Sequence, residues 1–129
     1  MIQRQDAQSD ELKAVIQIID EVHKLYPRME LSQLRVLLRV LEKPGIRTTD
    51  LGKVTGLAKS SLSRATRVLG AGDYTRDGDG SAQRGHNLIT TVSDPFDSRA
   101  NLVAPTALGR RLAEQIKKHI GECCGKSAG

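Results

Sequence analysis

One stretch of the chain combines short hydroxyls and long cations with no acid among them: Lys59, Ser60, Ser61, Ser63, Arg64 and Arg67. Apolar residues recur between them at helical spacing, so a helix would place the polar set on one face. Hydroxyls and cations bind phosphate oxygens, and side chains near a helix N-terminus can reach base edges. The pattern predicts a DNA-binding face. We expect phosphate contacts from Lys59 and Arg67, and positioning or base contacts from Ser61, Ser63 and Arg64. The alternative is a solvated basic face without function.

A second candidate pair, Asp97 and Arg99, lies in the turn-forming run DPFDSRAN between two β-prone segments. An arginine at a hairpin tip can enter a narrow minor groove, where negative potential is concentrated. Asp97 is two residues away and could hold the guanidinium in a fork, which would pre-orient it. The alternative is a surface ion pair of little energetic value.

The basic stretch follows a segment that is typical of a helix-turn-helix. Thr48 or Thr49 can cap a first short helix, with Leu51 and Val54 facing inward. Gly56 suits the left-handed residue that ends this helix. The second helix then begins near Lys59.

Two further helices are predicted upstream. The first runs from Ser9 or Asp10 to about residue 25, and Pro27 stops it. Its inward stripe is predicted to be Leu12, Val15, Ile16, Ile19 and Val22. Ile18 and Leu25 lie off this stripe, so they would contact either a local loop or a second copy of the chain. The second helix opens at Leu31 with Ser32 as its cap, and Pro44-Gly45 ends it. Its inward stripe is predicted to be Leu34, Leu37, Leu38 and Leu41, widened by Val36 and Val40.

The glycine-rich run 70–87 predicts a flexible loop, which could become ordered on DNA through Arg84 or remain a solvated linker. Residues 87–94 and 102–104 are predicted to form the strands of a β-hairpin wing. Thr106 would cap a last helix that ends at Gly121. The prediction is a mainly α fold with a small β-hairpin, a single winged helix-turn-helix domain over residues 1–129. It comprises an N-terminal helix (9–25), a winged core (31–105), a C-terminal helix (106–120) and a flexible tail (121–129).

Composition narrows the class of protein. The 129 residues carry a net charge of +5, which is compatible with a polyanion partner. Aromatic residues make up only 2%, which disfavours single-stranded nucleic acid, since stacking needs aromatic rings. Cys123 and Cys124 are adjacent, so they suggest neither a metal site nor a disulfide framework. We expect no metal or cofactor. No long apolar run or signal peptide is found, so a cytoplasmic protein of a bacterial or phage-infected cell is expected, with no membrane partner.

An enzyme is not expected. The three histidines, His23, His86 and His119, are scattered along the chain, without a nucleophile or metal ligand at a telling spacing. The glycines of residues 70–85 follow no strand-to-helix junction of the kind that binds phosphate.

Residues 31–113 resemble the MarR-type winged-helix regulators. The resemblance is carried by Asp94-Pro95-Phe96-Asp97-Ser98-Arg99, by Thr106 and Gly109 three residues apart, and by the Ser63-Arg64 pair. The departures from the family pattern are Gly52, Ala58, Ser98, Pro105 and a longer glycine-rich connection. The resemblance implies a homodimer formed through the N- and C-terminal helices.

The predicted function is a sequence-specific, double-stranded DNA-binding transcriptional regulator that binds a palindromic site as a homodimer. Two alternatives are a winged-helix protein-interaction module and an accessory DNA-binding factor in replication, partition or phage development. Repression, activation and any small-molecule effector are left open by the sequence.

Overall fold

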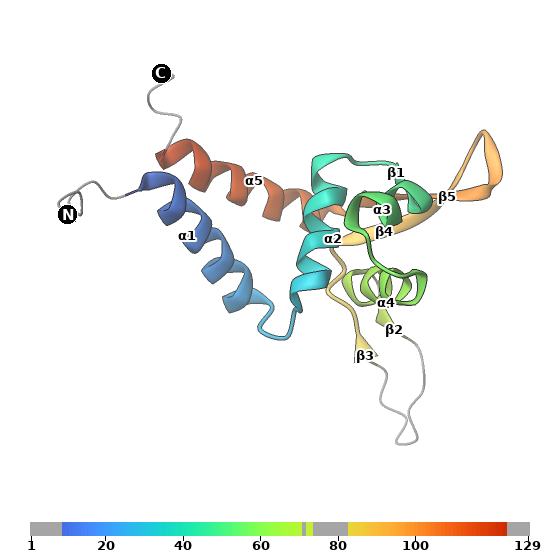
Figure 1. Ribbon diagram of the computed structural model, residues 1–129, viewed down its shortest axis with the longest axis horizontal. Helices are drawn as coiled ribbons and strands as arrows, with labels where there is room; N and C mark the ends of the chain where they lie inside the picture. Colours follow the sequence, from blue (N-terminus) through green and yellow to red (C-terminus); the bar gives the residue numbers. More distant parts are fainter. Residues whose placement is uncertain (1–8, 71, 74–82, 124–129) are drawn as a thin grey trace. The chain divides into compact units, whose positions relative to one another are not determined.

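The computed structural model describes residues 9–70, 72–73 and 83–123 (Figure 1). The chain divides into two compact units. One comprises residues 29–111, and the other combines residues 1–28 with residues 112–129. That the whole chain acts as one domain stays a prediction.

The smaller unit contains helix α1 (Asp10–Leu25) and most of helix α5 (Ala107–Cys123). Ser9 caps α1 as expected, because its Oγ accepts a hydrogen bond from the Leu12 N–H at 3.2 Å. The predicted inward stripe is wrong for four of its five residues. Its first four residues, Leu12, Val15, Ile16 and Ile19, are between 48% and 63% exposed. Val22, the fifth, is buried as predicted, together with Ala14, which the predicted stripe did not include.

Helix α2 (Leu31–Glu42) begins the larger unit, and its cap differs from the prediction. Glu30 is the N-cap rather than Ser32, and the Gln33 Oε1 atom accepts the Glu30 N–H at 3.0 Å. The buried stripe is also rotated relative to the predicted one. Gln33, Val36, Leu37 and Val40 are buried, whereas Leu38 is exposed. Apolar side chains occur on several sides of this helix, so periodicity alone did not determine its orientation.

The helix-turn-helix follows strand β1 (Ile46–Arg47) and consists of α3 (Thr48–Thr55) and α4 (Lys59–Leu69). Gly56 ends α3 in the left-handed conformation with φ 71°, as predicted. The predicted threonine cap is wrong, since the N-cap is Arg47. Val54 is exposed rather than inward. Thr55 takes the buried place, and its hydroxyl donates to the Leu51 carbonyl at 2.8 Å.

The wing is a hairpin of β4 (Ile89–Asp94) and β5 (Asp97–Pro105), with β1 along the free edge of β5. Only Pro95 and Phe96 form its turn, and β5 is much longer than the predicted strand at residues 102–104. Pairing runs in register from Ile89↔Pro105 to Ser93↔Asn101 and then shifts to Asp94↔Asp97. Within this hairpin, residues 98–100 therefore have no register partner on β4, and they form a bulge that carries Arg99.

The run 70–87 was expected to be a loop, but its ends are paired. Strand β2 (Gly72–Asp73) pairs with β3 (Gln83–Arg84). The rest of the predicted loop, residue 71 and residues 74–82, lies outside the described residues. The predicted tail also lies outside them, apart from residues 121–123, which extend α5 beyond Gly121.

Helix α5 begins where the wing returns, and two residues secure this junction. Thr106 caps the helix as predicted, because its Oγ1 accepts the Gly109 N–H at 3.1 Å and donates to the Asn87 carbonyl at 2.7 Å. A Cβ on Gly109 would lie 2.2 Å from the Leu88 carbonyl oxygen, so only glycine fits there. Around this junction the larger unit buries a core of aliphatic side chains: Leu37, Leu51, Leu69, Leu88, Ile89 and Val103.

Candidate nucleic-acid interface

Helix α4 exposes the whole of the predicted basic face. Leu62, Ala65 and Leu69 are buried against the unit. That burial places the polar and cationic side chains in solvent: Lys59, Ser60, Ser61, Ser63, Arg64 and Arg67. The first turn of α4 contains no acidic residue, so nothing in this turn opposes an approaching anion.

A groove of about 590 Å³ connects this face to the wing. Its walls come from α3, α4 and both wing strands: Thr48, Thr49, Gly52, Leu57, Lys59, Leu62, Ser63, Thr66, Thr91 and Asn101. The polar members are hydroxyls, one amide and one cation, and the described lining has no carboxylate. Neutral donors with one positive charge suit the phosphodiester backbone of a duplex.

Sequence reasoning found Lys59 and Ser63 in this groove but missed the others. Thr91 and Asn101 lie on opposite strands of the wing, and Thr48 lies on a different helix. The distance along the chain between these residues left no local pattern that could unite them. The one available signal was the run of hydroxyls at positions 48, 49, 90 and 91.

Arg99 projects from the bulge near the wing tip. The predicted fork between its guanidinium and Asp97 is not among the side-chain contacts of the described residues. The Asp97 carboxylate instead accepts the backbone N–H of Arg99 at 3.1 Å. The bond fixes the backbone that carries Arg99, so Asp97 shapes the wing rather than clamping the guanidinium.

The ion pair that does form involves Asp94, which is only 7% exposed. Arg47 Nη2 lies 3.0 Å from Asp94 Oδ2, and the Phe96 N–H donates to Asp94 Oδ1 at 2.9 Å. Arg47 is the N-cap residue of α3. Asp94 therefore joins the start of the helix-turn-helix to the tip of the wing, a link between residues 47 positions apart.

Within the part of the chain that the structure describes, Arg64 makes one weak side-chain contact. Its Nη2 lies 3.7 Å from Glu30 Oε2, and both side chains are largely exposed. Such a pair contributes little to stability, so a phosphate or base can compete for the guanidinium. Arg64 thus remains a candidate for DNA contact.

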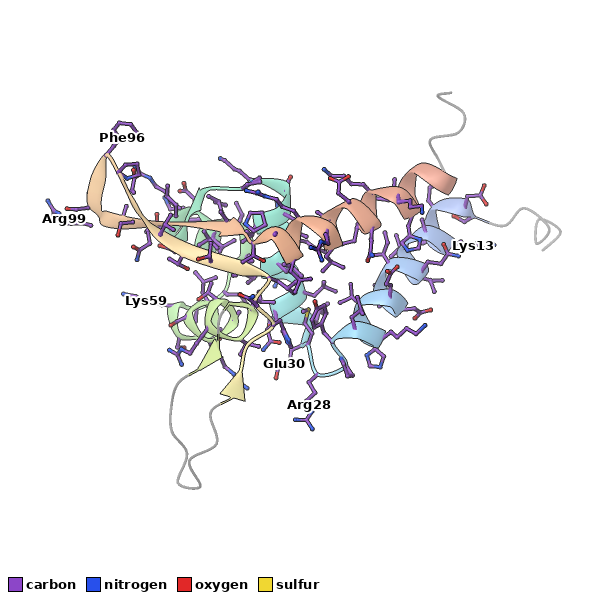
Figure 2. All side chains as sticks on the ribbon, turned by 180° about the vertical axis from the view of Figure 1, so that it is seen from behind. Lys13, Arg28, Glu30, Lys59, Phe96 and Arg99 are labelled. Carbon is purple, nitrogen blue, oxygen red and sulfur yellow. The ribbon has the colours of Figure 1, made fainter. Side chains whose placement is uncertain are left out.

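The two ends of the candidate surface point the same way. Figure 2 shows the side chains of Lys59, from α4, and Arg99, from the wing, reaching out on one side of the larger unit. Arg84 belongs to β3, but its side chain lies outside the described part of the structure. The other predicted side chains all lie on α4 or the wing.

Among the described residues, no group of three or more His, Cys, Asp or Glu residues could hold a metal ion. No helix among them is long and apolar enough to cross a membrane. Burial lowers the pKa of His86 below its usual 6.5, but this residue lies at the C-terminal end of α4, away from the groove.

Comparison with known proteins gives the fold. No family model matches the chain, and no curated protein matches it by sequence. Several solved structures match the fold of this chain. RV1404 from Mycobacterium tuberculosis aligns with TM-score 0.62 and 20% identity over 84% of this chain and 65% of that one. The MepR–DNA complex of S. aureus aligns with TM-score 0.60 and 18% identity over 84% and 77% of the two chains.

A third neighbour is MarR, with TM-score 0.53 and 19% identity over 86% of this chain and 76% of that one. The chain has the winged helix-turn-helix fold of MarR. The predicted fold class is therefore confirmed. In this fold α4 is the second helix of the helix-turn-helix, and β4 and β5 form the wing (Figure 1).

Proposed function

We propose that the protein is a sequence-specific, double-stranded DNA-binding transcriptional regulator. The observation that carries the proposal is the carboxylate-free groove joining the basic face of α4 to the wing. One structural neighbour, MepR, was solved with DNA. A duplex also suits the cations at both ends of the surface, Lys59 on α4 and Arg99 on the wing (Figure 2).

In this proposal α4 enters a major groove and the wing reaches the adjacent minor groove. The intervening sugar–phosphate strand then crosses the hydroxyl-lined groove between them. Arg64 reads a base edge, and Lys59, Arg67 and Arg84 bind phosphates. Arg99 enters the minor groove.

The proposed assembly is a homodimer formed through α1 and α5. It is supported by the four aliphatic side chains of α1 that remain exposed within the described chain. Contiguous exposed apolar patches mark sites of association. Two-fold symmetry then requires a palindromic site with half-sites about one helical turn apart, roughly 10 base pairs.

The test is selection of bound sequences from a random duplex pool, followed by affinity measurements on the selected site. Replacing Arg64 with Ala is expected to weaken the free energy of binding to the selected duplex by about 1–3 kcal/mol. The same substitution should relax specificity at one base position. Binding should also weaken steeply as salt rises, because phosphate contacts release counterions.

Arg39→Ala is the matched control. Arg39 is also an exposed arginine paired with a glutamate, Glu42, at 3.3 Å, but it lies on α2 outside the groove. Loss of the same charge at Arg39 should leave sequence preference unchanged. A pool that returns no preferred sequence, or equal effects of the two substitutions, would contradict the proposal.

A further inference from the structure

Phe96 is the only phenylalanine of the chain, and it is 94% exposed. It is the most exposed of the large hydrophobic residues in the described structure. Figure 2 shows its ring at the far end of the wing, beyond the ribbon and on the same hairpin end as Arg99. An aromatic side chain in this position contributes nothing to the core, and its ring is accessible to a partner.

The backbone under Phe96 is held in place. Its N–H donates to Asp94 Oδ1 at 2.9 Å, and Asp94 Oδ2 lies 3.0 Å from Arg47 Nη2. The two-residue turn that carries Phe96 is therefore fixed to strand β1. Because only the side-chain rotamers remain to be ordered, insertion of the ring would cost little conformational entropy.

The geometry points to Phe96 as an apolar wedge that enters the minor groove and partly unstacks a base step at the outer edge of each half-site. This inference rests on the proposed function and extends it. The ring continues the candidate interface, since the bulge that presents Arg99 begins two residues later. Proteins that bind the minor groove commonly insert phenylalanine in this way and kink the duplex.

Such a wedge would confer specificity at a position without hydrogen-bond readout. Unstacking costs less at flexible pyrimidine–purine steps such as TA or CA than at stiffer ones. The protein would therefore prefer a flexible step under Phe96. That preference would disappear with the ring, whereas the dependence of affinity on salt would stay, because Phe96 carries no charge.

The experiment uses the highest-affinity duplex from the random pool, with the fluorescent base 2-aminopurine placed in turn at each outer step. Wild type should raise the fluorescence at one position per half-site, because the base there loses its stacking. Phe96→Ala should abolish this rise and weaken binding by about 10- to 100-fold. Phe96→Leu should retain most of both effects, since leucine is also a wedge.

Val92→Ala is the matched control. Val92 is an exposed apolar residue of the same wing, 48% exposed, but it lies within β4 rather than at the turn. Its loss should leave the fluorescence and affinity unchanged. Replacing the flexible step by a stiff one should weaken wild-type binding but leave the affinity of Phe96→Ala unchanged.

Three results would overturn the inference. The first is that Phe96→Ala binds the selected duplex as tightly as wild type. That result would rule out the wedge and leave the proposed function intact. The fluorescence could stay constant at every position. Phe96→Ala could also change the mass of the free protein, which would place the ring against a second copy instead. Failure of the proposed function is distinct, because wild type would then select no duplex sequence.

Discussion

Among the glycines of the described structure, Gly109 has the least room for a side chain. Its Cα lies so close to the segment before the wing that an added Cβ would be 2.2 Å from the Leu88 carbonyl oxygen. The contact is with backbone rather than with a flexible side chain, so the junction between residues 88 and 106 would have to move. Thr106 donates its own N–H to the same carbonyl at 2.9 Å.

We expect Gly109→Ala to lower the free energy of unfolding by about 1–3 kcal/mol, as overpacking of a tight site does. Urea denaturation followed by circular dichroism measures this change. Gly121→Ala is the control, because Gly121 lies in the same helix with nothing within 4 Å of an added Cβ. That substitution should be neutral or stabilising, by up to about 1 kcal/mol. Equal stability of the two variants would contradict the packing argument.

The residues of the basic face could be predicted because they lie within nine positions of one helix, from Lys59 to Arg67. Spacing alone then decides which side chains share a surface. The link from Arg47 to Asp94 could not be predicted, since it joins residues 47 positions apart. Asp97 and Arg99 are close in sequence, but the register shift at Ser93/Asp94 changes the strand geometry on which their predicted fork depended.

At the scale of elements, the C-terminal end of α4 is closed by the segment that leads into the wing. The N–H groups of His86, Asn87 and Leu88 donate to the carbonyls of Val68, Gly70 and Leu69, at 2.9, 2.7 and 2.8 Å. The last carbonyls of a helix need such partners. Asn87 adopts the left-handed conformation with φ 58° to complete the contact.

The closure gives the fold a pH dependence, because burial in this segment lowers the pKa of His86 below 6.5. The folded state favours the neutral imidazole, so the unfolded state binds the proton first as pH falls. Stability is therefore complete above about pH 6.5 and decreases as the pH falls through the lowered pKa of the folded state. Thermal melting between pH 7.5 and 5 should show this loss. His86→Gln should flatten the curve, whereas His23→Gln, at an exposed site on α1, should not.

Helices were easier to predict than their orientations. The bounds of α1 and α4 follow from periodicity, Pro27, Gly56 and the glycine after α4. The predicted buried faces of α1 and α2 were only partly right, because both helices carry aliphatic residues on more than one side. Strands of two residues leave no local pattern, and β1 is held by a partner far away in sequence, since Ile46 pairs with Val103.

At the scale of the molecule, the smaller unit pairs α1 with α5. Glu21 Oε1 and His119 Nε2 lie 2.5 Å apart, which joins the two helices. The aliphatic stripe of α1 faces solvent instead: Leu12, Val15, Ile16 and Ile19. The proposed homodimer would remove this surface from water.

Ile16→Glu should therefore dissociate the dimer. A charge inside an apolar interface lacks a partner and costs several kcal/mol. Analytical ultracentrifugation should report half the wild-type mass, and affinity for the palindrome should fall with it. Gln17→Glu introduces the same charge on α1 outside the exposed aliphatic stripe and should leave the mass unchanged. A wild-type protein that sediments as a monomer at every concentration would contradict the proposed assembly.

The hydrogen bonds from Thr106 to Asn87 and Leu88 have a consequence for how this surface could change over time. They tie together the two ends of the hairpin, independently of what lies at its far turn. Ile89 and Val103 within the hairpin belong to the core, so only its exposed positions can vary without disturbing the body that holds it. Substitutions at those positions would change what the wing contacts and leave the scaffold as it is.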